Sequence, residues 1–308
     1  MGSLLRAWLD LEQRFHPHVA ATSPFRVSTA DFLGAMWLPV ATTALYIAAF
    51  SYGIRRMEKR NPWDMKRALA CWNFVLAAFS VCGALRTAPI LLGNLRAFPF
   101  RRSLCHAAAD DWGRGAAGLW VQLFILSKFA ELADTAFIVL RKKRLLFLHW
   151  YHHLTVLLYC WHSYATEAPH ALYFVAMNYA VHSLMYAYYG LMAVDAKPAW
   201  FLPEVVTGAQ ISQMVAGVFV QYSAARADCG VNRANLLAGS LMYASYLGLF
   251  VKFAVDRFVL KSYKRHEAIR AAAGQADAGN QWADAMPWTR WLAATIRRVA
   301  SFPKLAAP

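Results

Sequence analysis

Three histidines lie within five positions of one apolar segment. His149, His152 and His153 are spaced i, i+3 and i+4 in the stretch FLHWYHHLTVLLYCWHSY, and on a helix these positions share one face within about one turn. An imidazole can act as an acid or base, as a nucleophile or as a metal ligand. Packing alone would account for one such residue, whereas three on one face favour either a metal site or acid–base and nucleophilic chemistry.

Charged residues interrupt a second apolar segment, LSKFAELADTAFIVL. Lys128, Glu131 and Thr135 share a helical face, and Asp134 lies on the same flank as Glu131. Ionisable groups inside a segment that spans lipid are costly and need partners, so Lys128 and Glu131, at i and i+3, are the expected ion pair. Such a pair locks helix packing, orients a catalytic histidine, or does both.

Two further segments place polar side chains at helical spacing. In MNYAVHSLMYAYYGL, Asn178 and His182 are stacked at i and i+4, and Tyr186 continues the same stripe. We interpret His182 as a functional residue, because such a pair is costly in lipid. In TGAQISQ, Gln210 and Gln213 are one turn apart. These amides either join helices by hydrogen bonds or bind a polar ligand.

The elements that must position these residues are membrane-spanning helices. The chain of 308 residues is 59% hydrophobic and 16% charged, whereas soluble domains carry about a quarter charged residues. A bilayer core of about 30 Å needs about 20 apolar helical residues. Seven segments meet this requirement: 31–54, 68–95, 118–140, 145–165, 170–194, 200–222 and 235–260. We therefore predict an all-α, polytopic membrane protein with three parts: an N-terminal segment 1–30, a membrane domain 31–265 and a basic tail 266–308.

The basic residues give these spans an orientation. Lys and Arg gather in the connections 55–67 and 141–144 and in the tail. Because successive spans cross the membrane in opposite directions, these three segments lie on the same side. The more basic side is normally cytosolic, so we expect a cytosolic C-terminus and an N-terminus across the membrane. This placement accounts for the net charge of +15 without a nucleic-acid partner, which would need the charges on one soluble face.

Four motifs together resemble the ELO family of very-long-chain fatty acid elongases, the 3-oxoacyl-CoA synthases. They are KxxExxDT at 128–135, HxxHH at 149–153, NxxVHxxMYxYY at 178–189 and TxxQxxQ at 207–213. Each motif alone is weakly specific, whereas the four in this order on successive spans are highly specific. The sequence looks most like the subgroup that extends saturated and monounsaturated acyl chains.

The resemblance implies a fold and a reaction. Spans two to seven would form a six-helix barrel around an acyl tunnel closed on the lumenal side, with span one outside. In the endoplasmic reticulum membrane, with the N-terminus lumenal, a long-chain acyl-CoA would condense with malonyl-CoA to give 3-oxoacyl-CoA, CO₂ and CoA. Malonyl-CoA would be the co-substrate, with no bound cofactor or metal. Protein partners would be the ketoacyl-CoA reductase, dehydratase and enoyl-CoA reductase of the elongation cycle, and a homodimer is left open.

Roles for the site residues follow from this reaction. No cysteine lies in the histidine cluster, so a histidine either carries the acyl group or acts as a base. We hypothesise that His152 attacks the thioester in a ping-pong cycle through an acyl-imidazole. His149 and His153 would orient and deprotonate it, and His182 with Asn178 would polarise a carbonyl. The supporting polar residues are Lys128, Glu131, Asp134, Thr135, Tyr186, Gln210 and Gln213. The candidates for binding CoA phosphates are Arg55, Arg56, Lys142, Lys143 and Lys264.

Two of the five cysteines, Cys105 and Cys229, fall in the large non-cytosolic connections. If that side is oxidising, they are the only well-placed disulfide pair, although two free thiols fit the sequence equally well. The resemblance to the saturated-chain subgroup extends around both residues and favours the disulfide.

Two other classes of protein share some of these features. A membrane di-iron desaturase or hydroxylase also uses HxxHH boxes, but the central spans hold too few histidines for two irons: His149, His152, His153, His162 and His182. A seven-helix receptor or transporter would explain the span count and the buried charges. It would not explain three histidines on one turn beside a basic entry.

Overall fold

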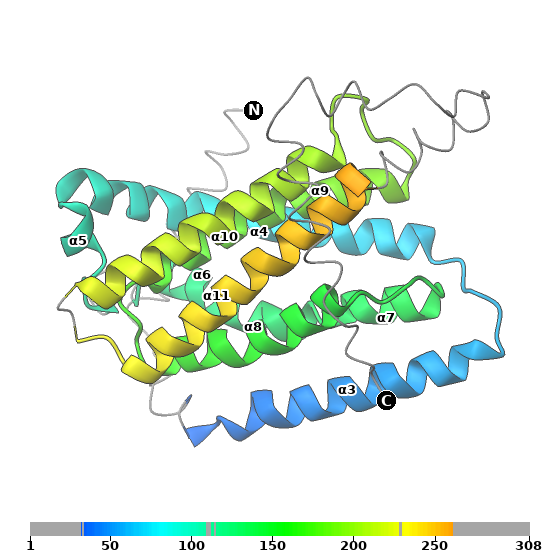
Figure 1. Ribbon diagram of the computed structural model, residues 1–308, viewed down its shortest axis with the longest axis horizontal. Helices are drawn as coiled ribbons and strands as arrows, with labels where there is room; N and C mark the ends of the chain where they lie inside the picture. The colour runs from blue at the N-terminus through cyan, green and yellow to red at the C-terminus, as the bar shows by residue number, and fades with distance from the viewer. Residues whose placement is uncertain (1–31, 33, 109–111, 114, 228–229, 261–308) are drawn as a thin grey trace, which may run out of the picture. The chain divides into compact units, whose positions relative to one another are not determined.

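The computed structural model describes residues 32, 34–108, 112–113, 115–227 and 230–260, and helices dominate this part of the chain (Figure 1). The helices are α3 (Trp37–Glu58), α4 (Lys66–Ala97), α5 (Phe100–Ser103), α6 (Gly115–Ala130), α7 (Ala133–Leu140), α8 (Phe147–Ala165), α9 (Ala171–Ala193), α10 (Pro203–Arg226) and α11 (Arg233–Ala254). No strand occurs among the described residues, so the predicted all-α class is confirmed.

The chain divides into two units. The first, Met1–Ala254, contains the nine helices named above. The second, Val255–Pro308, contributes the π-helix η2 (Val255–Leu260) to the described residues. The predicted N-terminal segment and most of the predicted tail lie outside the described residues, so the domain boundaries stay predictions.

Each predicted span coincides with helix, but the third is interrupted. α6 ends at Ala130 and α7 begins at Ala133, so the segment 118–140 is not the continuous helix that its hydropathy suggests. By length and composition, three helices are apolar enough to cross a membrane: Trp37–Glu58, Lys66–Ala97 and Arg233–Leu260. α8, α9 and α10 are not among these three helices, and they carry polar residues of the predicted site.

The long helices contact one another in a closed cycle. α4 packs on α9, α9 on α10, α10 on α11, α11 on α8, α8 on α6, and α6 on α4. α3 lies outside this cycle, where it contacts α7 and α8 and runs along one edge of the helix group (Figure 1). Large aromatic residues such as Trp161, Tyr179 and Tyr246 belong to the buried core.

Glycines allow α4 and α9 to pack closely. A Cβ atom on Gly83 would collide with the Tyr179 ring, and a Cβ atom on Gly190 would lie 2.7 Å from the Phe74 ring. The Tyr179 hydroxyl also donates a hydrogen bond to the carbonyl of Trp120 in α6, at 2.8 Å. Since small residues let helix backbones approach, these contacts hold α9 firmly between α4 and α6.

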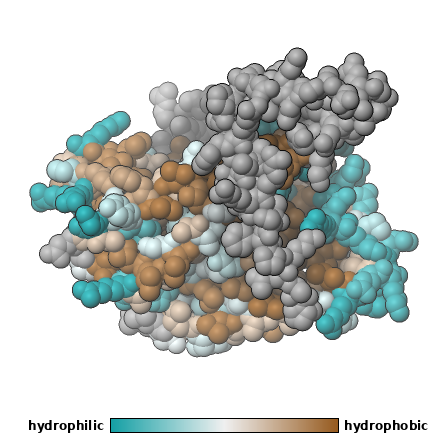
Figure 2. Space-filling model, viewed as in Figure 1, coloured by the Kyte–Doolittle hydropathy of each residue, from teal (hydrophilic) through white to brown (hydrophobic). Residues whose placement is uncertain are grey.

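Hydrophobic side chains dominate the exposed surface of the helices. In Figure 2 they gather between two ends that carry hydrophilic residues. On α3, Trp37, Leu45 and Tyr52 are each more than 60% exposed. Exposed apolar surface on this scale marks a contact with lipid or protein, and together with the three membrane-capable helices it identifies a membrane protein.

Candidate active site

A cavity of about 560 Å³ lies among the helices of the cycle. Four histidines line it: His149, His152 and His153 from α8, and His182 from α9. The structure therefore brings together the two histidine groups that are separate in the sequence. The volume is typical of small-molecule sites, which range over about 300–1,000 Å³.

The three α8 histidines form a contiguous set of rings near the start of their helix. The ring centroids of His149 and His153 are 4.4 Å apart, and those of His152 and His153 are 5.5 Å apart. Tyr246 of α11 supports His152: the two rings are 5.0 Å apart, and the tyrosine hydroxyl donates to the His152 carbonyl at 3.2 Å. The first turns of α8 thus present three imidazoles to one cavity.

A hydrogen-bond chain fixes His182 on the neighbouring helix. The Lys128 ammonium lies 2.7 Å from a Glu131 carboxylate oxygen and 3.4 Å from the Asn178 side-chain oxygen, and the Asn178 amide nitrogen lies 3.1 Å from His182 Nε2. Lysine can only donate, so the Asn178 oxygen faces Lys128 and its N–H donates to His182. His182 Nε2 therefore accepts, and the neutral ring carries its proton on Nδ1.

The break between α6 and α7 falls at Glu131. The Lys128 ammonium and the Ser127 hydroxyl, at 2.9 Å, both donate to Glu131 Oε1. Glu131 Oε2 has no hydrogen-bond partner among the described residues, although the side chain is buried and lines the cavity. The expected Lys128–Glu131 pair is confirmed, and the carboxylate keeps one oxygen for a ligand or water.

Asp134 does not join the Lys128 pair by a direct contact. Trp72 Nε1 of α4 donates to Asp134 Oδ1 at 2.5 Å, and the Tyr186 hydroxyl of α9 donates to Asp134 Oδ2 at 3.0 Å. Tyr186 packs edge-on against His182, with ring centroids 5.3 Å apart. Asp134 therefore fixes the tyrosine that supports His182.

Thr135 connects to the other histidine group. Its hydroxyl oxygen lies 3.0 Å from His149 Nε2 and 2.7 Å from the Tyr46 hydroxyl of α3. Sequence reasoning missed both Tyr46 and Trp72, because an aromatic residue in an apolar span usually serves packing or lies at the membrane interface. The only signal for Tyr46 was a hydroxyl in the middle of span one.

The two glutamines of α10 also reach the cavity. Gln210 and Gln213 both line it, and Gln210 Nε2 donates to the Met185 sulfur at 3.2 Å. Gln213 is 5% exposed. The contact with Met185 joins α10 to α9, while the cavity position suits ligand binding, so both interpretations from the sequence stand.

The basic residues that line the cavity are Arg141, Lys143 and Arg144, in the turn between α7 and α8. Of the predicted CoA-binding residues, Lys143 is therefore at the cavity. Arg55 and Arg56 are exposed in the last turn of α3 and are not part of its lining, and Lys264 lies outside the described residues. Arg141 and Arg144 of the same turn also line the cavity and were not among the predicted candidates, and CoA binding by this turn stays a prediction.

Lys142 has a structural contact instead of a place in the cavity lining. Its ammonium donates to the backbone carbonyls of Glu58, at 3.2 Å, and Arg60, at 3.1 Å. Its backbone adopts a φ of 51°, a left-handed conformation common where a helix ends. Lys142 thereby ties the α7–α8 turn to the α3–α4 connection.

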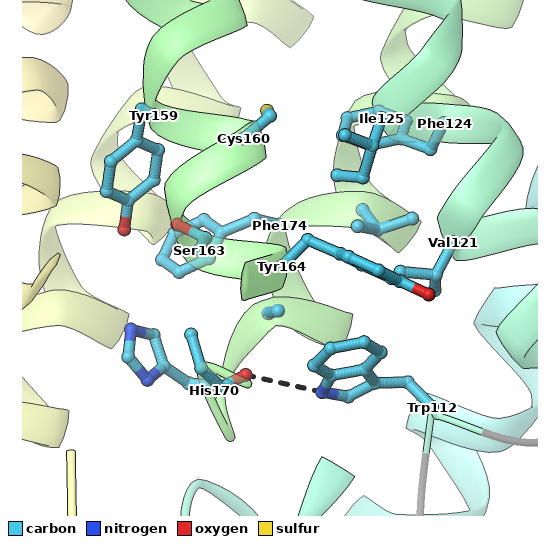
Figure 3. Close-up of a pocket in the computed structure, with 13 residues that line it drawn as sticks. Trp112, Val121, Phe124, Ile125, Tyr159, Cys160, Ser163, Tyr164, His170 and Phe174 are labelled. Carbon is cyan, nitrogen blue, oxygen red and sulfur yellow. Dashed lines mark hydrogen bonds between the residues drawn. The ribbon is translucent and has the colours of Figure 1, made fainter. Parts of the chain in front are cut away.

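A second, much smaller cavity lies near the opposite end of α8 (Figure 3). Its volume is about 30 Å³, and Cys160, His170 and Phe174 are among the residues that line it. Trp112 closes one side and donates from Nε1 to the Ala168 carbonyl at 3.3 Å. The space is about that of one water molecule, and none of the predicted catalytic residues borders it.

Three of the cysteines are free, and the described residues form no metal-binding cluster. Cys71, Cys82 and Cys160 are free thiols, and Cys105 is disulfide-bonded. Its predicted partner, Cys229, lies outside the described residues, so the pairing stays a prediction. Within the described part of the chain, no three His, Cys, Asp or Glu side chains converge as a metal site requires. The expectation of a metal-free site also remains untested.

Fold and site together define a class: helical membrane proteins in which one cavity is lined by histidines from two helices and by a basic edge, beside a buried Lys–Glu pair. The chain belongs to the ELO (GNS1/SUR4) family, whose model matches residues 32–266. It is 38% identical over 239 residues to the very long chain fatty acid elongase 6 of Drosophila melanogaster, covering 75% of each chain. The human protein of that name is 39% identical over 231 residues, covering 73% of this chain and 86% of its own. The fatty acid elongase 3 of Trypanosoma cruzi is 35% identical and is covered over 98% of its length.

Proposed function

We propose that the protein is the condensing enzyme of fatty acid elongation. It joins a long-chain acyl-CoA to malonyl-CoA and forms 3-oxoacyl-CoA, CO₂ and CoA. The names of its relatives support fatty acid elongation as the process. The single observation that carries the chemistry is the convergence of four histidines on one cavity, whose lining includes no cysteine among the described residues.

The first half-reaction is acyl transfer to a histidine. The unprotonated nitrogen of His152 attacks the thioester carbonyl, the carbon–sulfur bond breaks, and CoA leaves as the thiol after taking a proton. His153, whose ring is 5.5 Å from that of His152, accepts the proton that His152 loses and passes it to the CoA sulfur. His149 packs on His153 at 4.4 Å and orients it. The product is an acyl-imidazole, which remains reactive toward a carbon nucleophile.

The second half-reaction forms the carbon–carbon bond. Malonyl-CoA loses CO₂, and the electron pair of the broken bond becomes the carbanion that attacks the acyl carbon. The carbon–nitrogen bond then breaks, and the departing His152 nitrogen takes one proton, supplied from solvent through His153, which regenerates the neutral imidazole. His182, whose Nε2 accepts from Asn178, presents a protonated Nδ1, and this N–H stabilises the negative charge that develops on a thioester oxygen.

The basic turn supports binding of the CoA moiety. Arg141, Lys143 and Arg144 line the cavity beside the first turns of α8, and arginine and lysine bind phosphates through charge-assisted hydrogen bonds. An acyl-CoA whose phosphates contact this turn would place its thioester among the histidines. Its acyl chain would extend along the apolar interior of the helix cycle.

We infer that this arrangement lies in the endoplasmic reticulum membrane with seven spans. The closed cycle of contacts from α4 to α11 supports a six-helix barrel around the acyl chain, with α3 outside. The α7–α8 turn and the C-terminus would be cytosolic and the N-terminus lumenal, because the cytosolic side is the more basic. The 3-oxoacyl-CoA would then pass to a ketoacyl-CoA reductase, a dehydratase and an enoyl-CoA reductase.

Incubation of the purified protein with acyl-CoA alone tests the acyl-imidazole route. We expect one CoA released per active site and a mass increase equal to the acyl group on the peptide that contains His152. His152→Ala should abolish both signals while the protein stays folded. His162→Gln is the matched control, because His162 is on the same helix and contacts Asn235 away from the cavity.

Different failures would have different meanings. Elongation of acyl-CoA by labelled malonyl-CoA without a covalent adduct would remove the acyl-imidazole but keep the condensing activity. Absence of any labelled 3-oxoacyl product across acyl-CoAs of stepped length would overturn the proposed function. Activity that depends on a stoichiometric bound metal would favour the di-iron class instead.

A further inference from the structure

The buried hydroxyl of Tyr46 is unusual for its helix. α3 lies outside the cycle of helices, and its buried residues are Pro39, Tyr46 and Met57. Tyrosines on lipid-facing helices normally place their hydroxyl at the water interface, but Tyr46 lies in the middle of α3 and is only 7% exposed. Its hydroxyl therefore turns toward the protein, where it lies 2.7 Å from Thr135 Oγ1.

Thr135 continues this contact to the histidine cluster. The same hydroxyl lies 3.0 Å from Nε2 of His149, and Thr135 is 2% exposed. Tyr46 of α3, Thr135 of α7 and His149 of α8 therefore form one hydrogen-bond relay across three helices. His149 is the member that lines the cavity.

The direction of the relay follows from counting protons. A threonine hydroxyl has one proton, so Thr135 donates to one neighbour and accepts from the other. If Thr135 donated to Tyr46, the phenol proton would be buried without an acceptor, because Thr135 is its only hydrogen-bond partner among the described residues. A buried unpaired donor is costly, so Tyr46 donates to Thr135 and Thr135 donates to His149 Nε2.

We propose that Tyr46 is a positioning residue for the reaction and that it acts through Thr135 on His149. The relay holds His149 Nε2 as an acceptor and leaves the proton on Nδ1. Since the His149 ring packs on His153 at 4.4 Å, a fixed His149 also orders the histidine beside His152. The inference rests on the proposed function and extends the catalytic machinery to the helix outside the cycle.

Three substitutions that preserve shape test the relay. Tyr46→Phe keeps the edge contact of the ring with Phe50, at 5.1 Å, and removes only the hydroxyl. Thr135→Val is nearly isosteric and removes the link, whereas Thr135→Ser keeps it. We expect Tyr46→Phe and Thr135→Val each to slow CoA release from acyl-CoA about five- to tenfold, the effect of one hydrogen bond. The double variant should be no slower than Thr135→Val, and Thr135→Ser should restore the rate.

The matched control is Tyr52→Phe. Tyr52 is on the same helix and is 68% exposed, so its hydroxyl has no route to the cluster and its removal should leave the rate unchanged. Thermal unfolding of each variant in detergent separates a lost relay from a lost fold. Equal rates for Tyr46→Phe and wild type would overturn the proposal, as would additive losses in the double variant.

Nitrogen-15 NMR of histidine-labelled protein gives a readout that does not need turnover. The His149 signals, identified by their loss in His149→Gln, should show a protonated Nδ1 and an unprotonated Nε2. Thr135→Val removes the donor to Nε2 and should shift this ring toward the other tautomer. Tyr46→Phe frees the Thr135 hydroxyl to bond elsewhere, for example to the carbonyl one turn back in its helix, and should cause a smaller shift in the same direction. A protonated Nε2 in the wild type would overturn the relay direction. A relay signature in a protein that forms no 3-oxoacyl product would instead refute the proposed function and leave the relay standing.

Discussion

The Lys128 ammonium lies 2.7 Å from the Glu131 carboxylate, and both side chains are almost fully buried. Removal of one partner from such a pair leaves an uncompensated charge and typically costs about 3–5 kcal/mol. We therefore expect Lys128→Met to lower the free energy of unfolding by about 3 kcal/mol or more. Unfolding by heat or denaturant in detergent measures this loss.

The exposed pair Lys66–Asp195 provides the control for that measurement. Its two atoms are 3.3 Å apart, and the side chains are 61% and 80% exposed. Exposed pairs contribute about 0–1 kcal/mol, so Lys66→Met should be close to neutral. Equal losses for the two lysine variants would contradict the role of burial.

A second prediction concerns the tautomer of His182. In Asn178→Asp the side chain can no longer donate to His182 Nε2, although it still accepts from Lys128. Because the proton on Nδ1 would no longer be fixed, we expect kcat for elongation to fall about tenfold or more. Steady-state elongation with labelled malonyl-CoA measures this change.

Asn235→Asp is a closely matched control for this substitution. Asn235 Nδ2 lies 3.0 Å from Nδ1 of His162, so it also forms an Asn–His contact, but neither residue lines the large cavity. We expect Asn235→Asp to lower stability and to leave kcat per folded enzyme unchanged. A similar fall in kcat for both variants would show that the effect at Asn178 is not local.

A third prediction separates two sets of basic residues. Arg144→Gln should raise KM for acyl-CoA about three- to tenfold, with a larger effect at low ionic strength, because Arg144 lines the cavity and its charge attracts phosphates. Arg56→Gln removes a similar charge from the end of α3, away from the cavity lining, and should change KM little. If both variants raise KM equally, the effect is one of net charge and not of a site.

A fourth prediction concerns the close packing of α4 and α9. Gly83→Ala would place a methyl group against the Tyr179 ring, and overpacking of this kind costs about 1–3 kcal/mol. Gly93 is on the same helix and a Cβ atom there would meet nothing within 4 Å. Gly93→Ala should therefore be neutral or stabilise the protein by about 0.5–1 kcal/mol. Equal unfolding midpoints would mean that Gly83 is not a packing position.

Local spacing in the sequence predicted part of the site. The i, i+3, i+4 spacing of His149, His152 and His153 and the i, i+4 spacing of Asn178 and His182 depend only on helix geometry. The convergence of the two groups depends on which helices pack together, and no helical period encodes that. The resemblance to a known family implied that the two groups of residues converge, and the residues that line the cavity show this convergence.

Contacts between distant segments were beyond sequence reasoning. The break after Ala130 is invisible in a hydropathy pattern that runs on to Leu140. Neither the spacing nor the hydropathy places Thr135 beside His149. Lys142 and Lys143 are equivalent as charges in the sequence. Lys142 bonds to backbone carbonyls and Lys143 lines the cavity, a difference that the charges of the two residues do not encode.

The contacts of Lys142 have a consequence for how fast substrates arrive. Lys142 donates hydrogen bonds to the carbonyls of Glu58 and Arg60, and the Trp63 N–H donates to the Leu140 carbonyl at 3.0 Å. These hydrogen bonds fix the turn that contains Arg141 and Arg144. A turn held by these hydrogen bonds does not move as a flexible loop. Binding of the polyanionic CoA moiety on this side would then be governed by long-range electrostatic attraction and not by the opening of a loop. Association rates should then fall steeply as salt is added.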